Sequence, residues 1–130
     1  MALLASVFLP LLLMFHLVGP LPADLGVHGG QLSPCPGPQH CAQAFWTSDK
    51  SQSDFDSLAT AVTSLPGALI IENDGGYLHA EVSSAFFGFV DDLELHVDES
   101  GIQARSISRL GDSDLGVNGR RLAALKASLS

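Results

Sequence analysis

Two pairs of segments with strand-like patterns follow one another in the second half of the chain. In the first pair, ALIIEN and YLHAEVS flank Asp74-Gly75, and in the second, FVDDLELHV and IQARSISRL flank residues 98–101. An Asp-Gly pair between alternating apolar and polar residues is typical of a tight hairpin turn. The sequence therefore predicts two successive β-hairpins that form a four-stranded antiparallel meander.

The turn positions also predict which residues face each other across each hairpin. A two-residue turn at Asp74-Gly75 makes Ile71 the partner of Leu78 and Leu69 the partner of Ala80, all on the face opposite to the exposed one. In the second hairpin, a two-residue turn makes Glu94 the partner of Arg105, an ion pair worth about 0.2–1 kcal/mol if it is solvated. Antiparallel sheets commonly bury one face and expose the other. The exposed face is expected to carry Ile70, Glu72, Tyr77, His79, Glu81, Asp92, Glu94, His96, Arg105 and Ile107.

Two segments with helical periodicity flank the predicted meander. Ser53 can cap a first helix, whose apolar residues recur at helical spacing from Phe55 to Val62 before Pro66-Gly67 ends it. Asn118 can cap a last helix with a leucine stripe. Residues 25–52, rich in Gly, Pro, Ser and Gln, indicate an irregular segment. The predicted fold class is α+β: a four-stranded antiparallel meander flanked by an N-terminal and a C-terminal helix, preceded by an apolar N-terminal segment.

The chain begins with an apolar segment, residues 2–18, that contains no charged side chain. As a helix, it would span roughly 25 Å, slightly less than a hydrocarbon core of ~30 Å. Pro10 favours a signal peptide, whereas the absence of Lys or Arg before Lys50 does not. We expect residues 1–23 to be a signal peptide or an N-terminal membrane anchor. Residues 24–130 then form a single exported or membrane-anchored domain on the periplasmic or lumenal side.

Cys35 and Cys41 follow this segment, and two prolines and a glycine lie between them. In an exported chain both cysteines meet an oxidising compartment, and the turn-forming residues bring the thiols together. A disulfide is the favoured interpretation and would stabilise the domain by about 2 kcal/mol. Free thiols, or a metal site with His40, are the alternatives.

Three stretches of the chain resemble the domain of unknown function 1499 family. They are LGVHGGQLSPCPGPQHC, GGYLHAEVSSAFFGFVDDLELHVDESG and ARSISRLGDSDLGVN, and the resemblance extends over about residues 24–127. The resemblance implies an exported or membrane-anchored protein, and it implies no activity. The chain departs from the family pattern at four positions: His40 replaces a usual Asn, Ala85 a usual Arg, Asp112 a usual Tyr and Gly119 a usual Arg.

Charged residues concentrate in the second hairpin and the segment after it. The carboxylates of Glu81, Asp91, Asp92 and Glu94 oppose the guanidinium groups of Arg105, Arg109, Arg120 and Arg121. One interpretation is a site for a small anionic ligand, in which Asp91 and Asp92 orient Arg105 and Arg109. The other is a structural network of ion pairs that joins the central strands to the last helix.

A metal site is a second possibility. His79 and Glu81 share a strand face, as do Glu94 and His96, and imidazole with carboxylate suits zinc. Such a site would make the protein a small metal-assisted hydrolase. The serines lie in no nucleophile-elbow motif, and the glycines form no phosphate-binding loop. We therefore expect a non-enzymatic protein without a cofactor.

The charge composition limits the kinds of molecule that this protein can bind. Six basic residues against fourteen acidic ones leave a net charge of -8, which argues against nucleic-acid binding. The sequence favours a non-enzymatic binding or envelope-associated module, in contact with the membrane through residues 1–23 if these are retained. A structural partner of an envelope or membrane protein is the other alternative, with Phe86 and Phe87 as an exposed apolar patch.

Overall fold

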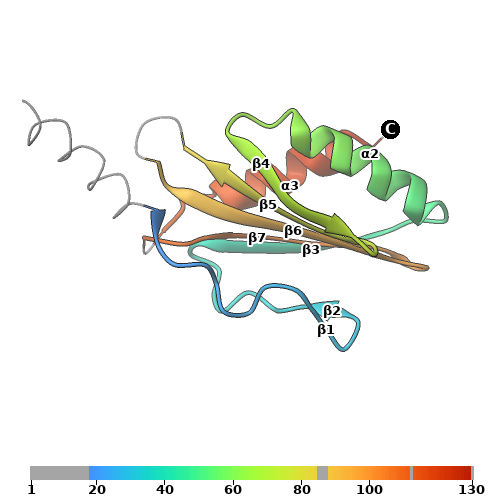
Figure 1. The fold of residues 1–130 in the computed structure, drawn as a ribbon, viewed down its shortest axis with the longest axis horizontal. Helices are drawn as coiled ribbons and strands as arrows, with labels where there is room; N and C mark the ends of the chain where they lie inside the picture. The colour runs from blue at the N-terminus through green and yellow to red at the C-terminus, as the bar shows by residue number, and fades with distance from the viewer. Residues whose placement is uncertain (1–17, 85–87, 112, 130) are drawn as a thin grey trace, which may run out of the picture.

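The computed structural model describes residues 18–84, 88–111 and 113–129. Their centre is a five-stranded antiparallel sheet with the strand order β3-β7-β6-β5-β4 (Figure 1). The strands are β3 (Cys41–Thr47), β4 (Ala68–Asp74), β5 (Tyr77–Ser83), β6 (Val90–Asp98) and β7 (Gly101–Ser108). The α+β class is therefore confirmed, and the four predicted strands are present.

The fifth strand, β3, corrects the prediction of an irregular segment there. It pairs antiparallel with β7, so that Ala44 lies opposite Ala104 and Trp46 opposite Ile102. Its sequence CAQAFWT alternates between the two faces of the sheet, but alanine and glutamine have little strand propensity, so that the pattern is weak. Pairing with a segment about sixty residues further along the chain makes it a strand.

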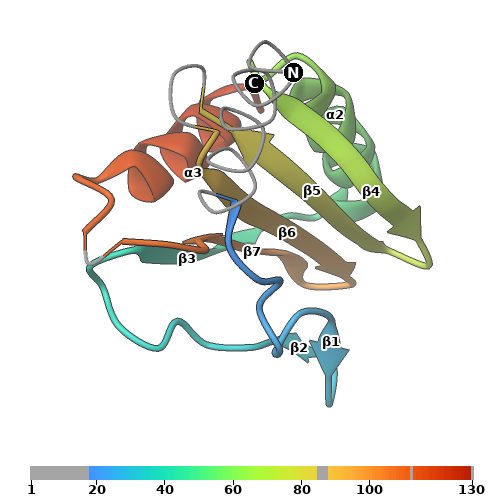
Figure 2. The ribbon, with the colours of Figure 1, turned by 60° about the vertical axis from the view of Figure 1, so that its left-hand side comes forward.

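Two helices, α2 (Ser51–Thr63) and α3 (Val117–Ala127), cover one face of the sheet (Figure 2). The core between the layers is apolar and includes Trp46, Phe55, Leu58, Leu93, Leu95, Leu122 and Leu125. The predicted apolar faces of both helices are therefore buried. Helix α2 begins two residues before Ser53. Its first turn is held by Ser48, whose hydroxyl accepts from the Lys50 N–H and donates to Asp54 Oδ2 at 2.6 Å.

The predicted cap of the last helix is wrong. Gly116, with a φ of 81°, occupies the N-cap position, and Asn118 lies inside α3 with a fully buried side chain. Asp114 caps the first turn in its place, because its carboxylate accepts from the backbone N–H of Gly116 at 2.7 Å and of Asn118 at 3.3 Å.

The two hairpins differ in how well the turn predicts the register. In β6–β7, Glu94 pairs with Arg105, as predicted. In β4–β5, Asp74 pairs with Tyr77, so the turn is Gly75-Gly76 rather than Asp74-Gly75. Both turn residues have positive φ, 60° and 78°, which glycine adopts without strain.

This shift and a β-bulge between Ile70 and Glu72 change which side chains of β4 face the core. Ile70, predicted on the exposed face, lies opposite Ala80 and packs against the core. Leu69 and Ile71, predicted to be buried, are 62% and 50% exposed.

The opposite face of the sheet is crossed by residues 24–35, which we call the strap. It contains a small hairpin of β1 (Val27–His28) and β2 (Gln31–Leu32), visible below the sheet in Figure 1. The strap leads into the predicted disulfide between Cys35 and Cys41, which is present with a Cα–Cα distance of 5.6 Å.

The predicted N-terminal segment and the Phe86–Phe87 patch fall largely or wholly outside the described residues, which include only Val18 to Ala23 of the former. In the described parts of the chain, neither helix is long and apolar enough to cross a membrane.

Candidate functional site

The sheet face below the strap carries ionisable side chains from three adjacent strands. Side chains of a strand alternate between faces, so that Tyr77, His79 and Glu81 of β5 share this face with Asp92 and Glu94 of β6. Arg105 of β7 joins them as the cross-strand partner of Glu94. Sequence alone predicts this face as solvated, but Asp92, Glu94 and Arg105 have no exposed surface.

Arg105 is the centre of the first ion-pair network. Its Nε donates to Glu94 Oε1 at 3.0 Å, and its two terminal nitrogens bind the Asp24 carboxylate in a bidentate contact at 2.9 and 3.0 Å. Burial would lower the pKa of Arg105, but hydrogen bonds and charge attraction from Asp24 and Glu94 outweigh it and raise that pKa. Arg105 is thus a permanent cation whose guanidinium is held by two carboxylates.

The strap completes this network from above. Glu94 Oε2 accepts from the backbone N–H of Gly26 at 2.7 Å and from the hydroxyl of Tyr77 at 2.6 Å. Burial and the hydrogen bond to Glu94 raise the pKa of Tyr77, so its hydroxyl remains a donor. The hydrogen bond from Arg105 holds the pKa of Asp24 below its usual value of 3.8. The strap is therefore joined to the sheet at the buried Glu94 and Arg105, whereas the side chain of Asp24 itself is 44% exposed.

Arg109 is the centre of a second network, just beyond the end of β7. It binds Asp92 through Nε at 2.8 Å and through Nη2 at 3.0 Å, and Nη2 also contacts Glu81 Oε2 at 2.6 Å. His79 Nε2 lies 2.7 Å from Asp92 Oδ1. Burial would raise the pKa of Asp92, but the hydrogen bonds from His79 and Arg109 outweigh it and lower that pKa.

Asp91 belongs to a different site from the other three predicted binding residues. It lies on the helix side of the sheet, where its carboxylate contacts Arg121 at 2.8 Å. Arg121 also donates to Ser106 and to Asn118 at 3.0 and 2.9 Å. Alternation along β6 therefore separates Asp91 from Asp92, although they are neighbours in the sequence.

The charge balance of the networks around Arg105 and Arg109 determines whether they can bind an anionic ligand. Arg105 faces two carboxylates, those of Asp24 and Glu94, and Arg109 likewise faces Asp92 and Glu81. The side chains of both arginines are nearly inaccessible, at 1% and 5% exposure. An anionic ligand would have to displace a carboxylate from either guanidinium. This geometry is typical of structural ion pairs.

The predicted metal ligands are brought together only in part. His79 and Glu94 are direct cross-strand partners, but His79 turns to Asp92 and Glu94 to Arg105. His96 Nδ1 lies 3.2 Å from the carbonyl oxygen of Gly76. The described residues contain no group of three or more His, Cys, Asp or Glu side chains that could hold a metal ion.

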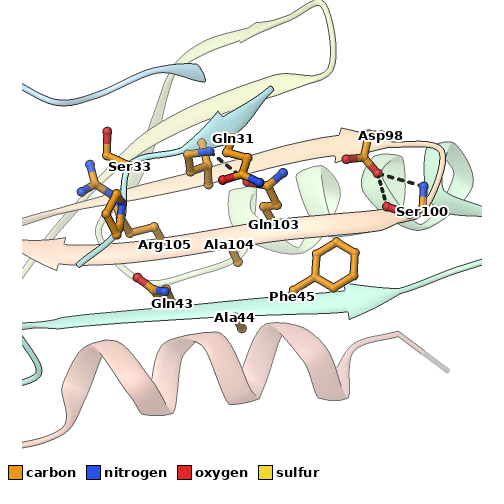
Figure 3. A pocket seen from close by; sticks show the side chains of 12 residues that line it. Gln31, Ser33, Gln43, Ala44, Phe45, Asp98, Ser100, Gln103, Ala104 and Arg105 are labelled. Atoms are coloured by element: carbon orange, nitrogen blue, oxygen red, sulfur yellow. Dashed lines mark hydrogen bonds between the residues drawn. The ribbon is translucent and has the colours of Figure 1, made fainter. Parts of the chain in front are cut away.

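A groove between the strap and the β3–β7 edge was not predicted from the sequence. It has a volume of about 530 Å³ (Figure 3). Its polar lining combines amides and hydroxyls with two charged groups, the carboxylate of Asp98 and the guanidinium of Arg105, and the half-exposed ring of Phe45 lies at one end. The amides and hydroxyls are those of Gln31, Ser33, Gln43, Ser100 and Gln103. Figure 3 shows Gln43 and Phe45 projecting from β3 toward the strap, while Ala44 points toward α3. No local sequence motif predicts the groove, because the groove forms only where the strap lies over the sheet.

A family model described as a protein of unknown function (DUF1499) matches residues 24–129, nearly the whole chain. The chain belongs to this family. No curated protein and no solved structure matches it.

The stretches that resemble the DUF1499 pattern are those that build the networks. Residues 75–101 and 104–118 carry the Glu94–Arg105 and Asp92–Arg109 pairs and Asn118. Two departures from the pattern lie in the described residues. Gly119 is exposed on α3 with open space around it, and the buried Nδ1 of His40 has no partner among the described atoms.

Proposed function

We propose that this DUF1499 protein is an exported or membrane-tethered domain that binds a ligand without transforming it. The ligand site is the groove between strap and sheet. The observation that carries the proposal is the groove of about 530 Å³, whose walls are hydrogen-bonding side chains beside a half-exposed Phe45. Small-molecule sites have this character: they are concave and largely preformed, and they combine an apolar surface with a few placed polar groups.

Two features support the location. Residues 2–18 are uncharged and apolar, which suits export or anchoring. The Cys35–Cys41 disulfide is of the kind that persists in oxidising compartments. Because this bond connects the strap to β3, it also fixes one wall of the groove relative to the other.

The walls are fixed further by hydrogen bonds between strap backbone and sheet side chains. Gln103 accepts from the Leu32 N–H at 2.9 Å and donates to the Gly30 carbonyl at 3.1 Å, and Gln43 accepts from the Cys35 N–H at 2.6 Å. Together with the bidentate contact between Asp24 and Arg105, they hold the strap in place. A preformed groove loses little conformational entropy on binding, which favours affinity.

The chemistry of the lining indicates a neutral ligand rich in hydroxyl groups, such as a short saccharide. Amides and hydroxyls both donate and accept, and so they match groups that do the same. The ring face of Phe45 offers an apolar platform for the carbon-bound hydrogens of a sugar ring. The nearby guanidinium of Arg105 already carries two carboxylates, so the groove has no strong attraction for an anion.

The test is a titration of the isotopically labelled protein with neutral and acidic oligosaccharides, followed by amide chemical shifts. We expect neutral sugars to shift β3, β7 and strap amides, and Phe45→Ala to weaken binding about tenfold, or ~1.5 kcal/mol. Phe89→Ala is the matched control, because it removes a ring of similar exposure, 40% against 49%, away from the groove. Equal loss in both variants, or no binding of any neutral sugar, contradicts the proposal and favours the assembly role.

A further inference from the structure

Exposed apolar side chains gather at the end of the sheet where β7 ends and α3 begins. Among the described residues, nine large apolar side chains are exposed, and five of them lie in the segments that meet there. These are Leu21, Phe89, Leu110, Leu115 and Val117. A cavity of about 580 Å³ opens between Leu110, Leu115 and Val117. Apolar groups concentrated in this way mark a surface that contacts something other than water.

The apolar N-terminal segment reaches the domain at the same end. Gly19, directly after residues 2–18, packs on the residues that follow β7: a Cβ on it would lie 2.8 Å from Leu110 Cγ and 3.1 Å from Arg109 Cβ. Its φ of 76° suits glycine. Leu21 follows two residues later and is 59% exposed. In Figure 1 the first described residues, in blue, lie at this end of the sheet.

Leu115 is held outward at this end by its own loop. It is 82% exposed and has a φ of 53°, the one positive φ outside glycine in the described chain. Its N–H donates to the Ser113 hydroxyl at 3.3 Å, and its carbonyl accepts from Arg120 Nη1 at 2.9 Å. A leucine is unfavourable in this backbone conformation and in water alike. An apolar medium around the Leu115 side chain would remove the cost of exposing it to water.

Most charged groups nearby are neutralised within the domain; the exception is the exposed Arg120, whose guanidinium contacts the Leu115 carbonyl. Arg109 and Arg121 are paired with buried carboxylates, and Asp114 turns inward to Gly116 and Asn118. The net charge of -8 gives the chain no attraction to anionic lipid. Binding of this end of the domain to a surface would therefore depend on its apolar side chains, and a zwitterionic lipid surface suits such binding.

We propose that this end of the domain rests on a lipid bilayer, with Leu115, Leu110 and Leu21 in its interfacial layer. The inference rests on the membrane tether of the proposed function, because residues 2–18 would cross or enter the bilayer beside these leucines. The groove then stays in water, since Phe45 lies opposite Gln103, near the β6–β7 turn at the far end of the sheet.

The test uses the full chain in phosphatidylcholine vesicles, with the Cys35–Cys41 bond intact and one added cysteine carrying a fluorescent label. Leu115→Cys places the label at the proposed contact, and Glu99→Cys places it in the β6–β7 turn at the other end. On replacing the lipid with its brominated form, the label at position 115 is expected to lose most of its fluorescence. The label at position 99 is expected to keep it.

Flotation of the chain with the vesicles separates this inference from the tether. A chain that floats while both labels respond equally, or while neither responds, overturns the proposed orientation and leaves the tether standing. A chain that does not float overturns both. The fluorescence at position 115 could instead change with the ratio of protein to lipid, and equally in brominated and unbrominated lipid. That result would mean that a second copy of the chain, rather than lipid, contacts this end, and it overturns the proposal.

Discussion

Glu94 and Arg105 face each other across β6 and β7 with both side chains fully buried, and Arg105 Nη2 lies 2.8 Å from Glu94 Oε1. The pair is covered by the strap, whose Asp24 and Gly26 provide further hydrogen bonds, and the Tyr77 hydroxyl of β5 provides another. A buried ion pair loses the hydration of both charges and is stable only when the remaining polar atoms also find partners. The pair is therefore a point where the strap and the sheet stabilise each other.

Removing one charge of this pair is expected to be far more harmful than removing an exposed charge. Arg105→Met leaves Glu94 buried without a cation and should lower the free energy of unfolding by about 3–5 kcal/mol. Arg120→Met, at an exposed arginine of α3, should change it by no more than about 0.5 kcal/mol. Urea unfolding followed by the fluorescence of Trp46 measures both. Similar losses in the two variants would show that burial of the pair has no energetic weight.

Stability is expected to fall in acid because of Asp24 and Asp92. The pKa of each lies below its usual value of 3.8, Asp24 through the hydrogen bond from Arg105 and Asp92 through His79 and Arg109 against the effect of burial. A carboxyl with a lowered pKa stabilises the folded state above its unfolded pKa, and this stabilisation is lost as the pH falls through the folded pKa. The free energy of unfolding should therefore decrease as the pH is lowered below about 4.

Asp24→Asn tests the contribution of the strap to this pH dependence. The variant should be less stable at neutral pH and should show a flatter decline in acid, since it removes one of the carboxyls whose pKa is lowered, which also include Asp92, Asp98 and Asp114. Glu99→Gln removes an exposed carboxylate in the β6–β7 turn and serves as control. If urea unfolding at several pH values gives the same acid slope for Asp24→Asn and the parent chain, the contact between Asp24 and Arg105 has no role in acid stability.

Reduction of the disulfide is expected to weaken the domain without unfolding it. Cys35 and Cys41 are six positions apart, so that the bond closes a short loop and should contribute about 2 kcal/mol. Urea unfolding with and without a reductant measures the difference. The double variant Cys35→Ser with Cys41→Ser should match the reduced protein and be insensitive to reductant. No effect of reductant on the parent chain would contradict the expectation.

Leu115→Asn is expected to stabilise the domain in the absence of lipid. Asparagine tolerates the left-handed backbone conformation better than leucine, so the substitution should raise the free energy of unfolding by about 1 kcal/mol. Leu21→Asn, at an exposed leucine without a positive φ, should give no such gain. Thermal unfolding of both variants in buffer without lipid or detergent tests this, and an equal response would assign any gain to reduced surface apolarity instead.

The sequence determined the parts of this protein that depend on near neighbours. The β6–β7 register, the apolar faces of the two helices and the Cys35–Cys41 bond all follow from spacings of a few residues. The sequence predicts the first hairpin turn one residue too early. Asp74-Gly75 and Gly75-Gly76 are both acceptable turn pairs, and only the bulge in β4 distinguishes them.

The tertiary structure decided which polar groups are buried and where a ligand could bind. Glu94 and Arg105 are buried because strap residues 68 and 81 positions away along the chain lie over them. Likewise, residues 41–47 are a strand because β7 provides their hydrogen bonds. A local pattern specifies the face on which a side chain lies, since alternation is a property of the backbone. Whether that face is wet depends on what distant segment covers it, and no local pattern contains this information.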